Sequence, residues 1–189
     1  SKWEIIDGQH RAMTAMKLGI PITYCMEKKS DDKTMRTLNT GGDNWLMNDH
    51  LHGLVEDGNP HYIKLQNFMK EFPELKITEC LMLCKNMYTS VPRGTFESGE
   101  FTTRDMNIAR TWGGYVMRMK PFAKYYNSGI FVRALIVCLG KECFNFEEFI
   151  HKVELRPTSL VKCGTREQYF ELFESIYHYR RSDKVNLRY

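Results

Sequence analysis

The chain has 189 residues, of which 42% are hydrophobic and 26% are charged, and its formal net charge is +4. This composition is ordinary for a globular protein, and no apolar run approaches the roughly 18 residues of a membrane-spanning helix. A charge this small fits a generic fold as well as a nucleic-acid binder. No signal peptide is visible, and we expect a cytoplasmic protein without a membrane partner.

The cysteines give no sign of a disulfide framework or a zinc site. No CxxC pair occurs, and Cys80 and Cys84, one helical turn apart, have no further pair at zinc spacing. Most of the six lie in apolar surroundings, which favours buried free thiols in a reducing compartment. They are Cys25, Cys80, Cys84, Cys138, Cys143 and Cys163.

The start of the chain is predicted to form a small strand–helix–strand unit. Residues 3–6 and 22–26 are short apolar segments typical of buried strands. Residues 12–18 predict a short helix between them, and Gly19 is suited to end it. Because the chain opens almost directly in a strand, we also expect further residues upstream.

Helical signals follow one another after residue 33. Residues 91–102 are predicted to form a loop, and a long helical stretch is predicted from about Thr103. Glycine or proline weakens that stretch at Gly113, Gly114 and Pro121. The predicted helix caps are Asn48, Asn59 followed by Pro60, Thr78, Asn145, and Thr165 with Gln168.

The expected fold class is therefore α+β and predominantly α. Residues 1–33 are expected to form a partial α/β unit, and residues 34–189 a helical body. No internal repeat or low-complexity tract interrupts this division.

The sequence DGQHR stands where the first predicted strand passes into the helix. The first backbone N–H groups of a helix lack partners and carry partial positive charge, which suits a phosphate. Gly8 would let a ligand approach the backbone, and Arg11 could grip a phosphate with two N–H groups. Gln9 and His10 add donors, and Asp7 could hold a metal ion or orient Arg11. The structural alternative is that Asp7 caps the helix and Arg11 pairs with a surface acid.

Residues 5–24, IIDGQHRAMTAMKLGIPITY, resemble the central motif of the ParB/sulfiredoxin-like superfamily. In that family a glycine-, polar- and arginine-rich stretch followed by alanines occupies a strand-to-helix junction. The residue pattern DGQHR is similar to that of the DGQHR-type members, which include ParB-like proteins of phages and mobile elements and the DndB-type proteins. Residues 38–65 resemble the segment that follows in phage-type members, and residues 169–187 resemble their C-terminal helix.

The resemblance implies a nucleotide site, with CTP or ATP and Mg²⁺ as the cofactor. In ParB the motif binds the phosphates of CTP, in sulfiredoxins it holds ATP, and a serine kinase of this fold uses it for an adenine nucleotide. Members are also labelled ParB-like nucleases. Residue by residue, Gly8, Gln9, His10 and Arg11 match the phosphate loop. Asn39 is the loose match to a downstream asparagine that helps to hold nucleotide and metal.

The chain departs from the family pattern in three places. Gln9 stands where the reactive cysteine of sulfiredoxins would fall, so sulfinic-acid reductase chemistry is not expected. The ENxQR pattern is replaced by TLNTGGDN around Asn39. The N-terminal strands that complete the family fold are not in this chain, and we expect it to hold only part of the pocket.

A second candidate surface lies at the end of the last predicted helix, where YHYRR interleaves aromatic and basic residues. Such a mixture can stack bases and hold phosphates, which makes Arg180, Arg181 and Lys184 candidates for nucleic-acid contact. The alternative is that the basic residues complement the helix C-terminus while the tyrosines pack on the body.

Two weaker signals favour structural explanations. His50 and His52, next to Asp49, are two residues apart, which points their rings away from each other on a helix, so no metal site is expected. Residues 77–90 resemble the first part of a helix-turn-helix, but their apolar content favours core packing.

We therefore expect a ParB-like nucleotide-binding protein of phage or mobile-element type that acts in a DNA-linked process. One alternative is an enzyme, either a ParB-like nuclease or a DndB-type ATPase, which metal-dependent turnover would reveal. Another is a non-catalytic DNA-binding or protein-interaction module whose helical body does the work without nucleotide.

Overall fold

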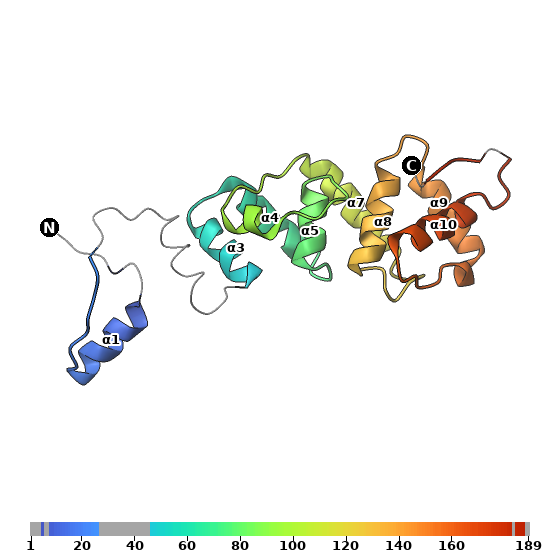
Figure 1. The fold of residues 1–189 in the computed structure, drawn as a ribbon. Helices are drawn as coiled ribbons and strands as arrows, with labels where there is room; N and C mark the ends of the chain where they lie inside the picture. Colours follow the sequence, from blue (N-terminus) through green and yellow to red (C-terminus); the bar gives the residue numbers. More distant parts are fainter. Residues whose placement is uncertain (1–4, 6–7, 27–45, 183, 188–189) are drawn as a thin grey trace. The chain divides into compact units, whose positions relative to one another are not determined.

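The computed structural model describes residue 5 and residues 8–26, 46–182 and 184–187. Within these residues every regular element is a helix and no strand is formed (Figure 1). The predicted α+β class is therefore wrong, and the described part of the protein is all-α. The chain divides into two compact units, residues 1–50 (unit 1) and residues 51–189 (unit 2). The predicted boundary at residue 33 lies outside the described residues.

The strand predicted at residues 22–26 is not formed. Ile22, Tyr24 and Met26 are 46%, 72% and 67% exposed, and the segment has no regular structure. A strand needs a neighbouring strand for its backbone hydrogen bonds and a face to bury, and the described residues supply neither. Of the strand predicted at residues 3–6, only Ile5 is described, and it is not in a strand.

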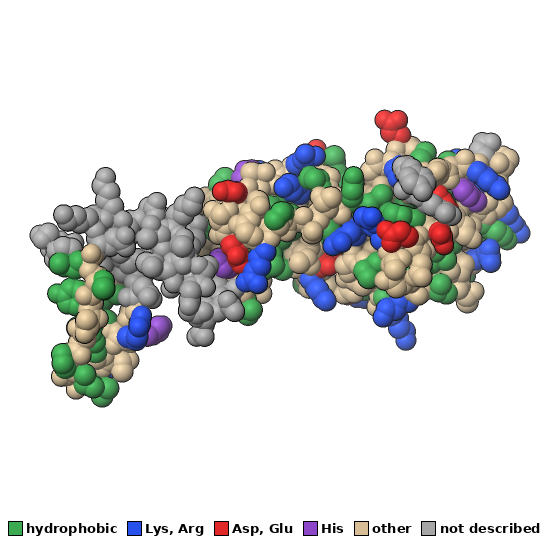
Figure 2. Space-filling model, viewed as in Figure 1, with side chains coloured by type: hydrophobic (Ala, Val, Ile, Leu, Met, Phe, Trp, Pro, Cys, Tyr) green, Lys and Arg blue, Asp and Glu red, His purple; other side chains and the backbone are tan. Residues whose placement is uncertain are grey.

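Unit 1 contains the helix predicted from its alanines, α1 (Gln9–Leu18). It ends where predicted, at Gly19, which has a left-handed φ of 63° and leaves the N–H of Ile20 bonded to the carbonyl of Ala15 at 3.0 Å. Ala12 is the buried residue of this helix, whereas Met16 is 80% exposed. Figure 2 shows hydrophobic side chains gathered over this segment.

The next helix, α3 (Met47–Glu56), begins earlier than predicted. Asn48 lies inside it and does not cap it. Instead, the carboxylate of Asp49 accepts a 2.8 Å hydrogen bond from the backbone N–H of Leu46. The helix ends shortly before Gly58, which has a φ of 76° and donates to the carbonyl of Val55.

Unit 2 is a helical assembly in which α5 and α8 occupy the centre. Helix α5 packs on α4, α7 and α8, while α8 also packs on α7 and α10, and α10 packs on α9 (Figure 1). The elements of this unit after α3 are α4 (Pro60–Glu71), α5 (Ile77–Cys84), α6 (Arg93–Glu97), α7 (Met106–Arg118), α8 (Gly129–Leu139), α9 (Phe146–Leu155), the short 3-10 helix η1 (Pro157–Ser159) and α10 (Arg166–Tyr177).

Aromatic rings hold α8 and α10 together in the core of unit 2. The ring of Phe131 lies edge-on to Tyr169 and Phe173, at centroid distances of 5.4 and 5.6 Å. Edge-to-face pairs of this kind stabilise a core beyond the area that they bury. Every residue from Glu79 to Cys84 of α5 is buried, which confirms core packing for this segment.

A buried carboxylate accounts for one incorrect cap prediction. Helix α5 begins after Lys76, and Thr78 does not cap it but donates its hydroxyl to Glu79 at 2.9 Å. The carboxylate of Glu79 lies over the first turn of α8, so that a Cβ placed on Gly129 would meet it at 2.7 Å. The positive end of α8 therefore offsets the cost of burying this charge.

Three other predicted caps are confirmed. The side chains of Asn59 and Asn145 accept hydrogen bonds from the first turns of α4 and α9. Thr165 and Gln168 form the predicted capping box of α10. Local side-chain chemistry thus starts three of the helices of unit 2.

Between residues 91 and 121 the helix predicted from about Thr103 is formed and ends before Pro121, but the predicted loop and the weak point at the two glycines are wrong. The predicted loop contains α6, which forms because its buried Phe96 packs against the ring of Tyr62 at 5.2 Å. The following helix starts after Asp105, which caps it, and continues unbroken through Gly113 and Gly114 to Arg118. Packing supplied by other helices overrides both local signals.

All six cysteines are free thiols. Cys80, Cys84 and Cys138 are buried, whereas Cys25 and Cys143 are exposed, so the expectation of buried thiols holds for only half of the set. Burial raises the pKa of Cys80 and of Cys138 to about 12. None of the described helices combines the length and apolar character that a bilayer crossing requires.

Candidate functional site

The candidate site of unit 1 is the first turn of α1. Gly8 precedes the helix in the left-handed conformation, with φ 76° and ψ 23°, which glycine adopts without the strain of a Cβ atom. Its carbonyl accepts the first helical hydrogen bond, from the N–H of Ala12 at 2.8 Å. The sequence thus places a glycine where the chain turns sharply into a helix.

The side chain of Arg11 folds back over Gly8. A Cβ placed on Gly8 would lie 3.1 Å from Nη2 and 3.2 Å from Nε of Arg11. The guanidinium therefore occupies the space that any larger residue at position 8 would take. It brings a permanent positive charge to the end of α1 where the helix dipole is also positive.

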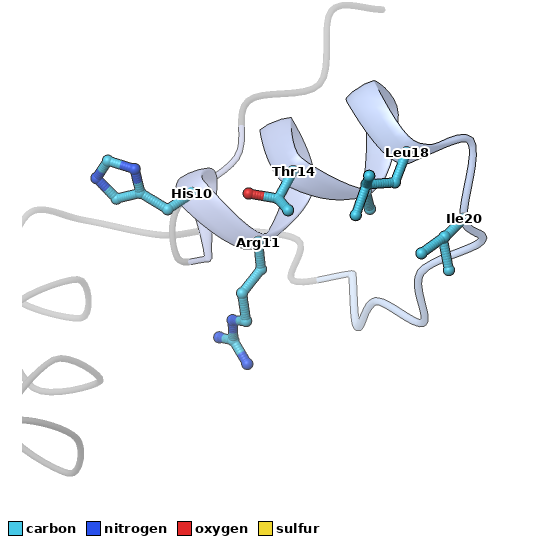
Figure 3. Close-up of a pocket in the computed structure, with 6 residues that line it drawn as sticks. His10, Arg11, Thr14, Leu18 and Ile20 are labelled. Atoms are coloured by element: carbon cyan, nitrogen blue, oxygen red, sulfur yellow. The ribbon is translucent and has the colours of Figure 1, made fainter.

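The neighbouring side chains lie differently. The amide of Gln9 donates to the carbonyl of Ile5 at 3.2 Å, so this side chain holds the preceding backbone. His10 is exposed and leaves the helix in a different direction from Arg11 (Figure 3). Of the predicted phosphate loop, the structure therefore brings together Gly8 and Arg11.

One face of α1 lines a shallow, open hollow of about 370 Å³ beside the guanidinium (Figure 3). Its walls are mostly apolar, and its polar groups come from the first turns of the helix. A hollow this open would leave much of a bound small molecule in contact with solvent. The lining residues are His10, Arg11, Thr14, Ala15, Leu18 and Ile20.

Two predicted site residues, Asp7 and Asn39, lie outside the described residues. Whether Asp7 caps α1, and whether Asn39 joins the site, stay predictions. In the described parts of the chain, no group of three histidine, cysteine or acidic side chains is placed to hold a metal ion. His50 is buried, whereas the exposed His52 faces Glu56 at 3.3 Å.

The basic residues at the end of α10 differ in what they contact. Arg181 pairs with Glu148 at 2.8 Å, and Lys152 reaches the same carboxylate at 3.1 Å. Lys152 also donates to the carbonyl of Tyr177 at 2.7 Å. Arg181 is therefore engaged in holding α10 against α9, as the structural alternative for this surface expects.

Arg180 and Lys184 are both exposed. The guanidinium carbon of Arg180 lies 5.2 Å from the ring centre of Tyr179, and that of Arg156, which follows α9, lies 4.9 Å from the same ring. Sequence reasoning missed Arg156, because only the packing of α9 on α10 brings it to this ring. No local pattern around Arg156 could have indicated this.

The comparisons with known proteins return no match: none of the family models, curated proteins or solved structures compared with this chain resembles it significantly. The ParB/sulfiredoxin-like resemblance therefore stays a prediction carried by residues 5–24. The two surfaces described above stand on their geometry alone.

Proposed function

We propose that the first turn of α1 binds the phosphate of a nucleotide, CTP or ATP, and that the protein acts in a DNA-linked process. One observation carries this proposal: the guanidinium of Arg11 lies over Gly8, 3.1 Å from where a Cβ would stand. A glycine in the left-handed conformation, a helix N-terminus and a planar cation meet at one point. This combination suits an oxyanion, because N–H donors and positive charge converge on it.

The hollow beside Arg11 supports a nucleotide over a bare phosphate. Its apolar wall, which includes Ala15, Leu18 and Ile20, continues from the guanidinium along α1. A nucleotide carries its charge at one end and an uncharged ring at the other. A phosphate on Arg11 would leave the ring and sugar to contact this wall, and Mg²⁺ would accompany the phosphates.

The proposal is tested by calorimetric titration of the protein with CTP, ATP and GTP in the presence of Mg²⁺. Arg11→Ala is expected to weaken binding by roughly 1.5–3 kcal/mol, the usual worth of a hydrogen bond to a charged group. Arg11→Lys should recover only part of this, because a point charge does not reproduce the guanidinium fork. Phosphate release in the same samples separates turnover from binding alone.

Two variants of the same helix sharpen the test. Gly8→Ala should also weaken binding, because a Cβ would strain a φ of 76° and push on Arg11. Lys17→Ala removes a charge from the last turn of α1 and should bind like the wild type. Equal binding by wild type and Arg11→Ala would refute the phosphate role. An equal loss in Lys17→Ala would show that only net charge matters.

A further inference from the structure

The ring of Tyr179 contacts two arginines, which follow α9 and α10 in unit 2. The guanidinium carbons of Arg156 and Arg180 lie 4.9 and 5.2 Å from its centre. Both distances are within the range of cation–π attraction, which favours a guanidinium over an aromatic face. The ring therefore holds two arginines near each other that would otherwise repel.

Arg180 adopts a backbone conformation that its residue type disfavours. Its φ is 54°, and the one other non-glycine residue with a positive φ in the described chain is Asn86. Asparagine tolerates this region, and the side chain of Asn86 bonds to the carbonyl of Leu83 at 3.0 Å. Arginine gains no such local bond, and residues held in this way concentrate at functional sites.

Hydrogen bonds from Val185 and Leu187 hold residues 184–187 against the end of α10. The N–H of Val185 lies 3.0 Å from Nε2 of His178, and the N–H of Leu187 donates to Glu174 at 2.7 Å. Leu187 is fully buried. Lys184, next to Val185, is exposed on this segment.

These cations differ from other arginines of unit 2 in their acidic neighbours. Arg110 and Arg118 contact Glu71 and Glu147 at 3.0 and 2.5 Å. Among the residues that the structure describes, no carboxylate lies within ion-pair distance of Arg156 or Arg180. Among the described residues, the recorded contact of each guanidinium is instead the ring of Tyr179.

We propose that Arg156 and Arg180, whose guanidinium groups lie against Tyr179, bind the phosphodiester backbone of a nucleic acid together with the exposed Lys184. Phosphates recur every few ångströms along a strand, so several cations on one surface can each meet one. The aromatic ring between them offers a face or edge to a neighbouring base. This surface belongs to unit 2, and the inference does not depend on nucleotide binding by α1.

Fluorescence anisotropy with labelled single-stranded and duplex oligonucleotides, between about 50 and 200 mM salt, tests the inference. Arg156→Gln and Arg180→Gln should each weaken binding roughly tenfold at the lowest salt. Each should also reduce the slope of log K against log salt, by about 0.7 for single strands and 0.9 for duplex. Arg110→Gln makes the same charge change at an arginine paired with Glu71, and should leave affinity and slope unchanged.

Arg180→Gly separates binding from folding. Glycine relieves the strain of a positive φ, so this variant should unfold no more easily than the wild type while binding as weakly as Arg180→Gln. Tyr179→Phe keeps the ring and should keep most of the affinity. Lys17→Ala, which removes a cation from the last turn of α1, should bind oligonucleotide like the wild type.

Four outcomes would overturn the inference. Arg180→Gly could bind like the wild type, or Arg110→Gln could lose as much affinity as Arg156→Gln. Full displacement of the oligonucleotide by millimolar inorganic phosphate would indicate a site for one anion instead of a strand. Binding to anionic phospholipid vesicles, with the same variant pattern and without oligonucleotide binding, would assign the surface to a membrane.

Discussion

Helices α1 and α8 have nearly the same length, and a glycine follows each, yet they use their apolar residues in opposite ways. Helix α8 buries six residues, among them Phe131, Leu135 and Cys138. Helix α1 buries Ala12, while Met13, Met16 and Leu18 are 57%, 80% and 65% exposed. Local signals therefore suffice to form a helix, whereas its burial depends on which other elements pack against it.

The two units also differ in how their helices begin. Helix α1 starts from a glycine, which has no side chain to offer, whereas α10 starts from the capping box of Thr165 and Gln168. An arginine then covers the first turn of α1, whereas Arg166 at the start of α10 contacts Glu167 and the ring of Phe170. The helix start that we assign to a ligand is therefore the one that has no side-chain cap.

The largest expected effect tests the contrast in burial. Phe131→Ala should lower the free energy of unfolding of unit 2 by about 3–5 kcal/mol, because it leaves a cavity among packed rings. Met16→Ala, at an exposed residue of α1, should change stability by no more than about 0.5 kcal/mol. Urea unfolding followed by circular dichroism measures both. Equal effects would show that α1 is buried against something in solution.

Two adjacent glycines of α7 test how tightly the helices of unit 2 are packed. A Cβ on Gly113 would lie 2.9 Å from the ring of Phe72, whereas one on Gly114 would meet nothing within 4 Å. Gly113→Ala should therefore cost about 1–3 kcal/mol by overpacking. Gly114→Ala should stabilise the helix by about 0.5–1 kcal/mol. Thermal unfolding of both variants checks the opposite signs, and a shared sign would contradict this packing.

The capping box of α10 should contribute less than the core. Thr165→Ala removes the acceptor of the N–H of Gln168 and is expected to cost about 1 kcal/mol. The control is Thr102→Ala, an exposed threonine outside any helix, for which a change within about 0.5 kcal/mol is expected. Chemical denaturation distinguishes the two. A neutral Thr165→Ala would mean that α10 is held by packing alone.

The smallest expected effect is a pH dependence in unit 2. Hydrogen bonds from Lys120 and Tyr126 hold the pKa of Glu74 below its ordinary value of 4.5. A carboxyl with a lowered pKa in the folded state stabilises the fold above pH 4.5, and this stability is lost as the pH falls through the folded-state pKa. Glu74→Gln should therefore flatten the loss of stability in acid.

Unfolding midpoints measured between about pH 3 and pH 7 would reveal this difference. Glu100→Gln, at an exposed carboxyl with no ion pair in the described part of the chain, is the matched control. An acid response of Glu74→Gln as steep as that of the wild type would place the responsible groups elsewhere.

Helix starts and ends were predictable where a side chain or a glycine acts within a few residues. The side chains of Asn59, Asn145 and Thr165 each accept a hydrogen bond from the first turn of the helix that follows them, and Gly19 adopts the expected left-handed turn. Prediction failed at Thr78, because its hydroxyl serves the buried Glu79. That carboxylate lies against the first turn of α8, an element distant in sequence.

The candidate sites divide in the same way. Gly8 and Arg11 are three positions apart in the sequence, so their contact follows from one helical turn and was predictable from DGQHR. Arg156 and Tyr179 belong to different helices, and their contact needed α9 to pack on α10. The side chain of Gln9 donates to the carbonyl of Ile5. This was not predictable, because the motif offers several donors and the sequence does not say which of them faces a phosphate and which bonds to the backbone.

The sequence by itself determined most helices of residues 46–182, three of their caps and the glycine-to-helix turn of α1, because these depend on neighbours within one or two turns. Only the tertiary structure decided that residues 22–26 form no strand, since an apolar run becomes a strand only beside a partner. It also decided which cations contact a carboxylate and which contact an aromatic ring. Arg181 meets Glu148, whereas Arg156 and Arg180 meet the ring of Tyr179, and long-range packing alone makes that choice.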